Sequence, residues 1–266
     1  WPLPSMALLA LTLALLARTV ATTLYVVKPL DMASDSFDDQ YQDCGPAMKE
    51  ALPALNSSEF QKNPLFAQVW QKAVAQWQKL GSPVSPLSSS DQAIAIIAYT
   101  TSDLQQEFNK DVSTAGSSPQ EYRDNFHFKT LHFLLTDALA TLRDTRKEQE
   151  CLCVHWGVDQ YKFKANEGDT VRFGQFTLSK PCEGGYELST TTLFSGPTCY
   201  GVDIRAFTGN LNSENVLIPP FEKFNVTKVI KHGEKVQILL NSIGTNSKYN
   251  CEWLKGGDSL GLWGHP

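Results

Sequence analysis

The sequence changes character near Cys151, and this change restricts the fold more than any other feature. Before that point, apolar residues recur every three or four positions, as in amphipathic helices. After it, short apolar runs typical of strands alternate with Gly, Asn, Ser and Pro. A helical half followed by a strand-rich half predicts an α+β fold. We expect one domain over residues 23–266, with a helical part (about 44–150) packed on a strand-rich part (about 151–255).

Three signals mark helix starts in the first half. Asn63 before Pro64 is a good N-cap, and apolar residues recur from there to Gly81. Residues 102–105 and 118–121 each have the pattern of a capping box, and we expect the second to open one long helix. The apolar face of that helix comprises Leu131, Leu134, Leu135, Ala138, Leu139 and Leu142. The strand-like runs of the second half are 161–163, 170–173, 216–218, 225–230 and 236–240.

The N-terminus indicates the compartment. Residues 6–17 are apolar except for Thr12, which suits the hydrophobic region of a signal peptide and is too short to span a bilayer core of ~30 Å. We expect residues 1–22 to be a signal peptide, with residues 1–5 upstream of the initiator Met6, and the mature chain to be secreted. A buried hydrophobic helix is the alternative.

Other features agree with an extracellular protein. Asn56 and Asn225 each begin an N-x-S/T sequon, which predicts a glycoprotein. Residues 256–266 contain no hydrophobic tail, so we expect neither a GPI anchor nor a transmembrane segment in the mature chain. Either the protein is freely secreted or the sequence continues beyond Pro266. The net charge of −5 argues against nucleic acid as a partner.

In an oxidising compartment the six cysteines allow 15 pairings. A bridge between Cys44 and Cys251 ties the two ends of the mature chain and closes a very long loop, where the entropic gain is largest. Zinc is a poor alternative because there is no Cys-x-x-Cys pair and the histidines are scattered, so we expect no bound metal. An acidic N-terminal group lacks the spacing of an EF-hand calcium loop, and we expect it to form a solvated surface. It consists of Asp31, Asp35, Asp38 and Asp39.

Several long strings, in the same order, resemble the vertebrate ecto-mono-ADP-ribosyltransferases that modify arginine, especially the avian secreted forms. They are residues 31–41 with 44–46, residues 63–68, Ala98-Tyr99-Thr100, residues 122–132, Phe173-Gly174-Gln175-Phe176 and residues 216–222. The resemblance covers nearly all of the mature chain.

The resemblance implies a fold in which two abutting sheets cradle NAD beside a helical N-terminal subdomain. It implies transfer of ADP-ribose from NAD or NADP to a protein arginine, without a metal, by a monomer. It also implies the disulfides Cys44–Cys251 and Cys151–Cys199. Cys153 and Cys182 are extra to that scheme and are either free or paired with each other.

The sequence departs from the family's three catalytic motifs. By resemblance, Trp156 stands at the position of the arginine that grips the pyrophosphate. Leu178 and Lys180 stand at the two serines of the second motif, and Asn215 stands at the catalytic glutamate. Ser213 replaces the upstream glutamate, which leaves Glu214 as a weak carboxylate candidate on the other face of the strand.

Each substitution has two interpretations. Trp156 either fills the vacated space by packing or stacks on a ring of the dinucleotide, and packing is the better interpretation. Lys180 is either a solvated surface charge or a replacement cation for the pyrophosphate. The residues expected near the cofactor by resemblance are Tyr99, Gln175 and Phe176.

Two functional hypotheses follow. The first is a secreted arginine-specific ADP-ribosyltransferase that uses NAD or NADP. The second is a non-catalytic secreted protein that keeps the fold for NAD or protein binding. Function is decided by the site rather than by the fold, so we expect weak or absent transferase activity.

Overall fold

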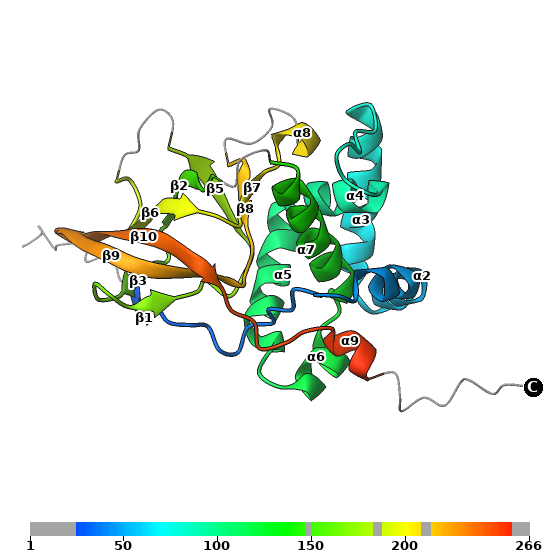
Figure 1. The fold of residues 1–266 in the computed structure, drawn as a ribbon, viewed down its shortest axis with the longest axis horizontal. Coiled ribbons are helices and arrows are strands. Elements are labelled where there is room, and N and C mark those ends of the chain that lie inside the picture. Colours follow the sequence, from blue (N-terminus) through cyan, green and yellow to red (C-terminus); the bar gives the residue numbers. More distant parts are fainter. Residues whose placement is uncertain (1–24, 147–149, 183–187, 209–213, 257–266) are drawn as a thin grey trace, which may run out of the picture.

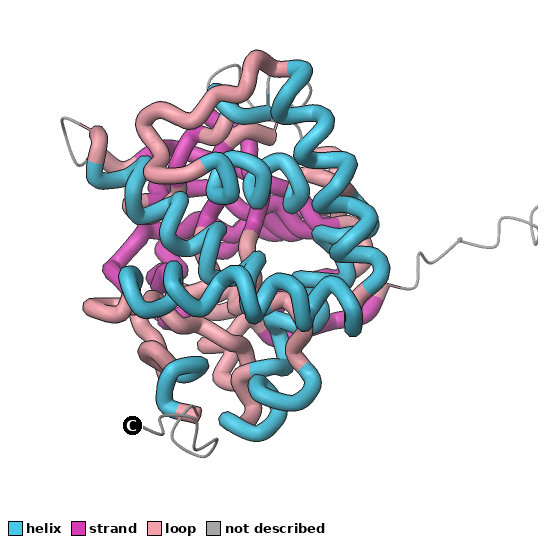
Figure 2. The backbone as a smooth tube through the Cα atoms, turned by 90° about the vertical axis from the view of Figure 1, so that its right-hand side faces the viewer, coloured by secondary structure: helices cyan, strands magenta, loops and turns pink. Residues whose placement is uncertain are grey.

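The computed structural model describes residues 25–146, 150–182, 188–208 and 214–256. The expected signal peptide at 1–22 lies outside these residues. Helices pack beside a strand-rich part in an α+β arrangement, and the β9–β10 hairpin projects at the end away from the helices (Figure 1). Seen from the helical side, the helices lie in front of the strands (Figure 2).

Six helices precede the large sheet in the described part of the chain: α2 (Gly45–Lys62), α3 (Pro64–Lys79), α4 (Ser90–Tyr99), α5 (Ser102–Ala115), α6 (Pro119–Asn125) and α7 (Lys129–Asp144). The start of α3 is confirmed, because Pro64 is its first residue and the Asn63 side chain accepts the Phe66 N–H at 3.0 Å. The short helices α8 (Arg205–Thr208) and α9 (Glu252–Lys255) follow later.

The capping box predicted at residues 102–105 is wrong. Thr101 is the N-cap of α5, and its side chain makes no capping bond. The amide of Gln105 donates instead to the Tyr99 hydroxyl at 3.3 Å. A complete capping box does open α4, where Ser89 and Gln92 cap each other.

The single long helix predicted from Ser118 is also wrong, because the chain breaks into α6 and α7. Phe126 ends α6 in an extended conformation. The α7 helix then begins against a buried carboxylate of α2, since Glu59 accepts the N–H groups of Lys129 (2.6 Å) and Thr130 (2.9 Å). Glu59 satisfies two of the four unpaired donors at that helix start, and its negative charge suits the helix dipole. Residues 70 positions away in the sequence set this boundary, so local capping rules do not find it.

The strands are β1 (Val26–Pro29), β2 (Leu152–Val158), β3 (Tyr161–Lys164), β4 (Thr170–Val171), β5 (Thr177–Pro181), β6 (Thr192–Thr198), β7 (Val202–Asp203), β8 (Val216–Ile218), β9 (Glu222–His232) and β10 (Lys235–Thr245). Eight of them form one sheet in the order β4-β9-β10-β6-β2-β5-β8-β7, and β1 pairs with β3 in parallel. Two registered residue pairs join β2 to β5, and this short junction separates the sheet into two abutting parts.

Buried apolar residues form two clusters. The helical cluster lies among α2–α7 and includes residues of β5 and β8, such as Leu217 and, at its margin, Leu178. The sheet cluster gathers side chains of β2, β6, β9 and β10 with Trp156 among them. The two faces of β8 therefore contribute to different cores, Leu217 to the helical cluster and Val216 and Ile218 to the sheet cluster.

The expectation that the acidic N-terminal group is a solvated surface is wrong for two of its members. Asp38 and Asp39 are fully buried. Asp38 pairs with the buried Arg172 guanidinium and accepts the N–H groups of Lys248 and Tyr249. Asp39 accepts three backbone N–H groups, from Tyr41, Cys251 and Glu252. These carboxylates join the N-terminal segment to the segment before α9.

Three disulfides are present: Cys44–Cys251, Cys151–Cys199 and Cys153–Cys182. The first two are the pairs that the resemblance implies. The third pairs the two extra cysteines with each other and links β2 to the end of β5, so β2 is bridged towards both of its neighbours in the sheet.

Candidate functional site

The segment from Phe173 to Ser179 contains three of the candidate residues, Gln175, Phe176 and Leu178. Its first part borders a pocket of about 430 Å³ between the N-terminal segment, the end of α5 and β3. The candidate Gln175 lies in this lining with the two aromatic side chains Phe163 and Phe173. The charged residues around it are Lys28, Asp31, Asp35 and Arg172. Because Asp38 already neutralises Arg172, the remaining charges are one lysine and two carboxylates.

Trp156 packs inside the sheet cluster and is only 6% exposed. Its ring stacks on Phe194 with centroids 5.2 Å apart and meets the edge of Phe173 at 4.9 Å. The indole therefore packs against aromatic side chains of the sheet cluster.

Leu178 and Asn215 lie on neighbouring chain segments. Leu178 pairs with Leu217 across β5 and β8 and packs at the margin of the helical cluster. The Asn215 N–H donates to the Ser179 carbonyl at 3.0 Å, and the Asn215 carbonyl accepts the Ile204 N–H at 2.8 Å. Its side-chain Oδ1 is buried and has no hydrogen-bond partner among the described residues.

Two of the three substituted positions have side chains in different clusters. Leu178 packs against the helical cluster, whereas Trp156 belongs to the sheet cluster. What these side chains offer is an indole, an isobutyl group and an amide. None of them carries a charge.

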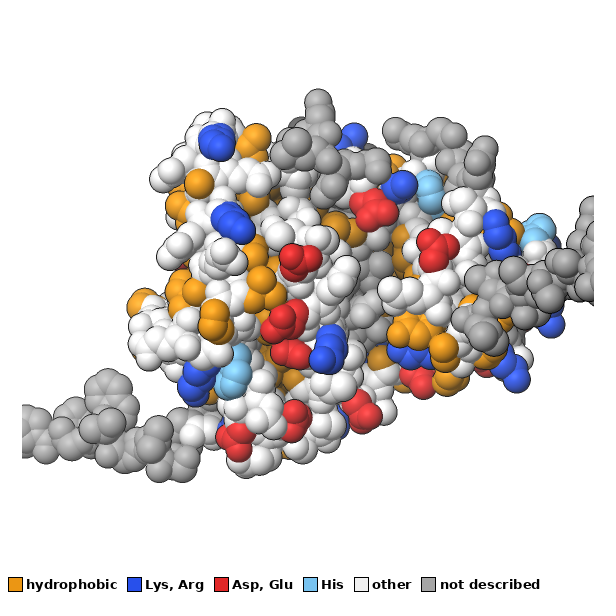
Figure 3. All heavy atoms as spheres, turned by 180° about the vertical axis from the view of Figure 1, so that it is seen from behind, with side chains coloured by type: hydrophobic (Ala, Val, Ile, Leu, Met, Phe, Trp, Pro, Cys, Tyr) orange, Lys and Arg blue, Asp and Glu red, His pale blue; other side chains and the backbone are white. Residues whose placement is uncertain are grey.

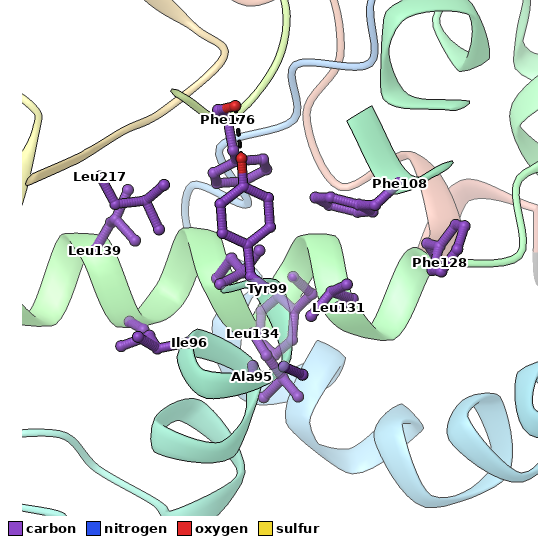
Figure 4. Packing of buried hydrophobic residues seen from close by; sticks show 14 of the residues in the cluster. Ala95, Ile96, Tyr99, Phe108, Phe128, Leu131, Leu134, Leu139, Phe176 and Leu217 are labelled. Atoms are coloured by element: carbon purple, nitrogen blue, oxygen red, sulfur yellow. Dashed lines mark hydrogen bonds between the residues drawn. The ribbon is translucent and has the colours of Figure 1, made fainter. Parts of the chain in front are cut away.

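Tyr99 and Phe176, two of the residues expected near the cofactor, are fully buried. The Tyr99 hydroxyl donates to the Phe176 carbonyl at 2.7 Å (Figure 4). Asn109, which the sequence analysis missed, donates to the same carbonyl at 2.9 Å and to the Tyr99 oxygen at 3.1 Å. This network fixes the segment between Gln175 and Leu178. The spacing of Gln105 and Asn109, one turn apart on α5, is the sequence signal that points to it.

Glu214 lies close enough to influence this network. Burial raises the pKa of the Tyr99 phenol, and the negative charge of Glu214 adds to the rise. Glu214 itself is partly exposed. It is the carboxylate adjoining Asn215 in the chain.

Lys180 lies beside His155, with which it is registered across the β2–β5 junction. Burial lowers the pKa of the His155 imidazole, and the charge of Lys180 lowers it further. The lysine is partly exposed, so both of its interpretations stay open. Ser213 lies outside the described residues.

Within the described ranges, no group of three or more His, Cys, Asp or Glu side chains is arranged to hold a metal ion. The helices of that same part of the chain include none that is both long and apolar enough to cross a bilayer.

Comparison with known proteins defines the class. Residues 30–248 match the family model described as NAD:arginine ADP-ribosyltransferase. NAD(P)(+)--arginine ADP-ribosyltransferase 2 of Gallus gallus is 41% identical over 97% of this chain and 87% of its own. GPI-linked NAD(P)(+)--arginine ADP-ribosyltransferase 1 of Mus musculus is 43% identical over 85% of this chain and 74% of its own. The crystal structure of the eukaryotic mono-ADP-ribosyltransferase ART2.2 superposes with a TM-score of 0.69 and 31% identity, over 84% of this chain and 98% of that one.

The fold is that of a mono-ADP-ribosyltransferase. The chain belongs to the NAD:arginine ADP-ribosyltransferase family.

Proposed function

We propose that this family member has weak or no arginine ADP-ribosyltransferase activity and keeps the fold for binding, of NAD or NADP or of a protein. The observation that carries the proposal is the side-chain chemistry at the three motif positions. Trp156 is packed in the sheet cluster, Leu178 is packed on the helical cluster, and Asn215 presents a neutral amide.

The reaction of the family requires charges that these side chains do not have. Cleavage of the nicotinamide glycosidic bond develops positive charge on the ribose, and a carboxylate stabilises it. An amide oxygen carries only a partial charge, so Asn215 supplies a fraction of that stabilisation. A pyrophosphate is held best by an arginine fork, which an indole cannot imitate.

Glu214 supports the alternative of residual transferase activity, because it is the nearest carboxylate in the chain to Asn215. By resemblance, however, the catalytic glutamate position is Asn215 and not Glu214. A carboxylate one residue away needs a displaced substrate to take over the catalytic role. We therefore rank this alternative second.

Dinucleotide binding without transfer has a precedent among relatives. ART2.2 variants in which a glutamate is replaced by isoleucine or alanine are described in complex with NAD and NADH, respectively. The pocket beside Gln175 is the candidate site here. Its charges, Lys28 against Asp31 and Asp35, attract a pyrophosphate only weakly, which favours low affinity.

The proposed setting is extracellular. Relatives carry the names ecto-ADP-ribosyltransferase and GPI-linked transferase, which agrees with secretion of this chain. Glycosylation is proposed at Asn56 on α2. At Asn225 on β9 the amide nitrogen already donates to the Gly168 carbonyl at 3.1 Å, so modification there requires that bond to break. We expect a monomer whose partner, if it transfers ADP-ribose, is a protein arginine.

Parallel measurements of binding and bond cleavage test this proposal. The chain from residue 23 is titrated with NAD and with NADP by calorimetry, and nicotinamide release is followed in the same samples. We expect weak binding and nicotinamide release at background. Gln175→Ala should weaken binding, and Gln78→Ala, at an exposed position of α3, serves as the matched control. Rapid nicotinamide release contradicts the proposal, and absence of any binding leaves protein recognition as the retained role.

A further inference from the structure

A second pocket, of about 170 Å³, lies between α7, the N-terminal segment and the turn after β6. Its wall is mixed, with amide, hydroxyl and guanidinium groups next to a few apolar side chains. The lining residues that matter here are Gln40, Gln42, Thr136, Arg143 and Tyr200. None of the candidate site residues discussed above is part of it.

The two glutamines stand on a tightly held stretch of backbone. The residues on either side of Gln42 both have positive φ, 54° at Tyr41 and 66° at Asp43, which non-glycine residues seldom adopt. The Asn250 side chain clamps both backbone groups of Gln42, accepting its N–H at 2.8 Å and donating to its carbonyl at 3.2 Å. The Tyr41 hydroxyl is held by a 2.9 Å hydrogen bond to the buried His132 ring. The side chains of Gln40 and Gln42 are thus presented from a rigid support.

The same two glutamines also border a wider pocket of about 440 Å³. Its lining is rich in hydroxyl, amide and ammonium groups: Thr245, Asn246, Ser247, Lys248, Asn250 and Lys255. The two pockets therefore share Gln40 and Gln42 in their linings, and together they are called the polar groove below. A chain-like polar ligand can place one unit in the small pocket and the next in the wide one.

Thr136 supplies independent support for a ligand. The residue is 3% exposed, it lines the small pocket, and its hydroxyl has no hydrogen-bond partner among the described residues. Leaving a buried hydroxyl unpaired costs free energy. A ligand hydroxyl or oxyanion in the pocket removes that cost.

The small pocket is also electropositive on the α7 side. The Arg143 guanidinium lies over the Tyr200 ring at 4.8 Å and forms an ion pair with the exposed Asp144 at 3.3 Å. Arg146 follows one turn later and donates to the Gly201 carbonyl at 3.2 Å, and its Nε has no partner among the described residues. Burial lowers the pKa of Arg146, and the charge of Arg143 lowers it further. An anion between the α7 helix and Tyr200 relieves this repulsion.

We propose that the groove binds an acidic glycan, with a sugar ring bearing a carboxylate or a sulfate in the small pocket. Arg143 takes the anionic group, Thr136 and Gln42 bond the ring hydroxyls, and the following sugar lies along the wide pocket. Hydroxyl-rich ligands match a lining of amides and hydroxyls, and charge-assisted bonds from a guanidinium select an oxyanion. This inference does not depend on the transferase chemistry.

Calorimetry with three saccharides tests the inference on the chain from residue 23. The probes are 3′-sialyllactose for the carboxylate, a sulfated heparin disaccharide for the sulfate, and neutral lactose. We expect one of the two acidic probes to bind at least tenfold more tightly than lactose. Equal affinity for all three, or no binding of either acidic probe, overturns the proposal.

Variants locate the binding. Arg143→Met should lower the affinity for the acidic probe at least tenfold. Thr136→Val, which has nearly the same side-chain volume, should lower that affinity several-fold. Lys72→Met, on α3, removes an exposed positive charge elsewhere and should leave affinity unchanged. Each variant is checked by thermal unfolding, and Gln42→Ala replaces any that does not fold. Full affinity in Arg143→Met, or equal loss in Lys72→Met, refutes the site.

Discussion

The N-terminal segment and the candidate site contain similar polar side chains in very different states. In the N-terminal segment, Asp38 and Asp39 are fully buried, and each is held by three or more donors. At the candidate site, Asn215 has a buried oxygen without a described partner. Asp38 and Asp39 are thus committed to joining the ends of the domain. Trp156, Leu178 and Asn215 carry no charge.

Removing one disulfide from each region should give the largest changes in the free energy of unfolding. The Cys44–Cys251 bridge spans 207 positions and the Cys153–Cys182 bridge spans 29. Loop entropy gives about 5 kcal/mol for the first and about 3.5 kcal/mol for the second. Double serine variants measured by denaturant unfolding should follow this order, and a larger loss from the bridge near the site would reverse the comparison.

Breaking the buried ion pair should have the next largest effect. Arg172→Met leaves the Asp38 carboxylate buried without its cation, which costs about 4 kcal/mol of unfolding free energy. Asn215→Ala removes an amide whose oxygen has no described partner and should cost less than about 1 kcal/mol. Urea unfolding of both variants checks the contrast, and similar losses would show that Asn215 is as structurally committed as Arg172.

Restoring the family's arginine should cost stability rather than bring function. Trp156→Arg places a guanidinium among Phe173 and Phe194 without a partner, and we expect a loss of about 3 kcal/mol, because a long arginine can reach partly towards solvent. Trp156→Phe keeps the aromatic packing and should cost about 1 kcal/mol. If Trp156→Arg unfolds at the same denaturant concentration as the unmodified chain, Trp156 does not belong to a sealed core.

The loss of stability at acidic pH should depend on His132, which is buried in the helical core. Burial lowers the pKa of His132 to about 3, whereas the unfolded chain titrates near 6.5. Between these values the unfolded state binds the extra proton, so stability falls as pH drops from about 6.5 towards 3, by up to about 1.4 kcal/mol per pH unit. His132→Gln should flatten this slope, and the exposed His232→Gln should not.

Patterns of neighbouring residues predicted one helix start correctly and missed features that depend on distant residues. The Asn63–Pro64 start of α3 depends on neighbouring residues only and is confirmed. The break before α7 depends on Glu59, a tertiary partner, and a sequence pattern does not contain it. The sequence pattern predicts Asp38 and Asp39 to be surface residues. It does not show that backbone N–H groups more than 200 positions away donate to them.

The candidate site shows the same limit. Resemblance named the substituted positions, but it did not predict that Tyr99 and Phe176 are buried or that Asn109 joins them. It also did not predict that Leu178 and Trp156 serve different cores, because that depends on how β5 and β8 separate the two clusters.

Transfer of labelled ADP-ribose from NAD to polyarginine tests the central claim most directly. The unmodified chain should transfer at background, since an amide in place of a carboxylate forfeits roughly 10²–10³ in rate. The Leu178→Ser, Asn215→Glu double variant should rise above it, and Glu214→Gln should change nothing. Robust transfer by the unmodified chain that is lost in Glu214→Gln would contradict the account and assign the catalytic carboxylate to Glu214.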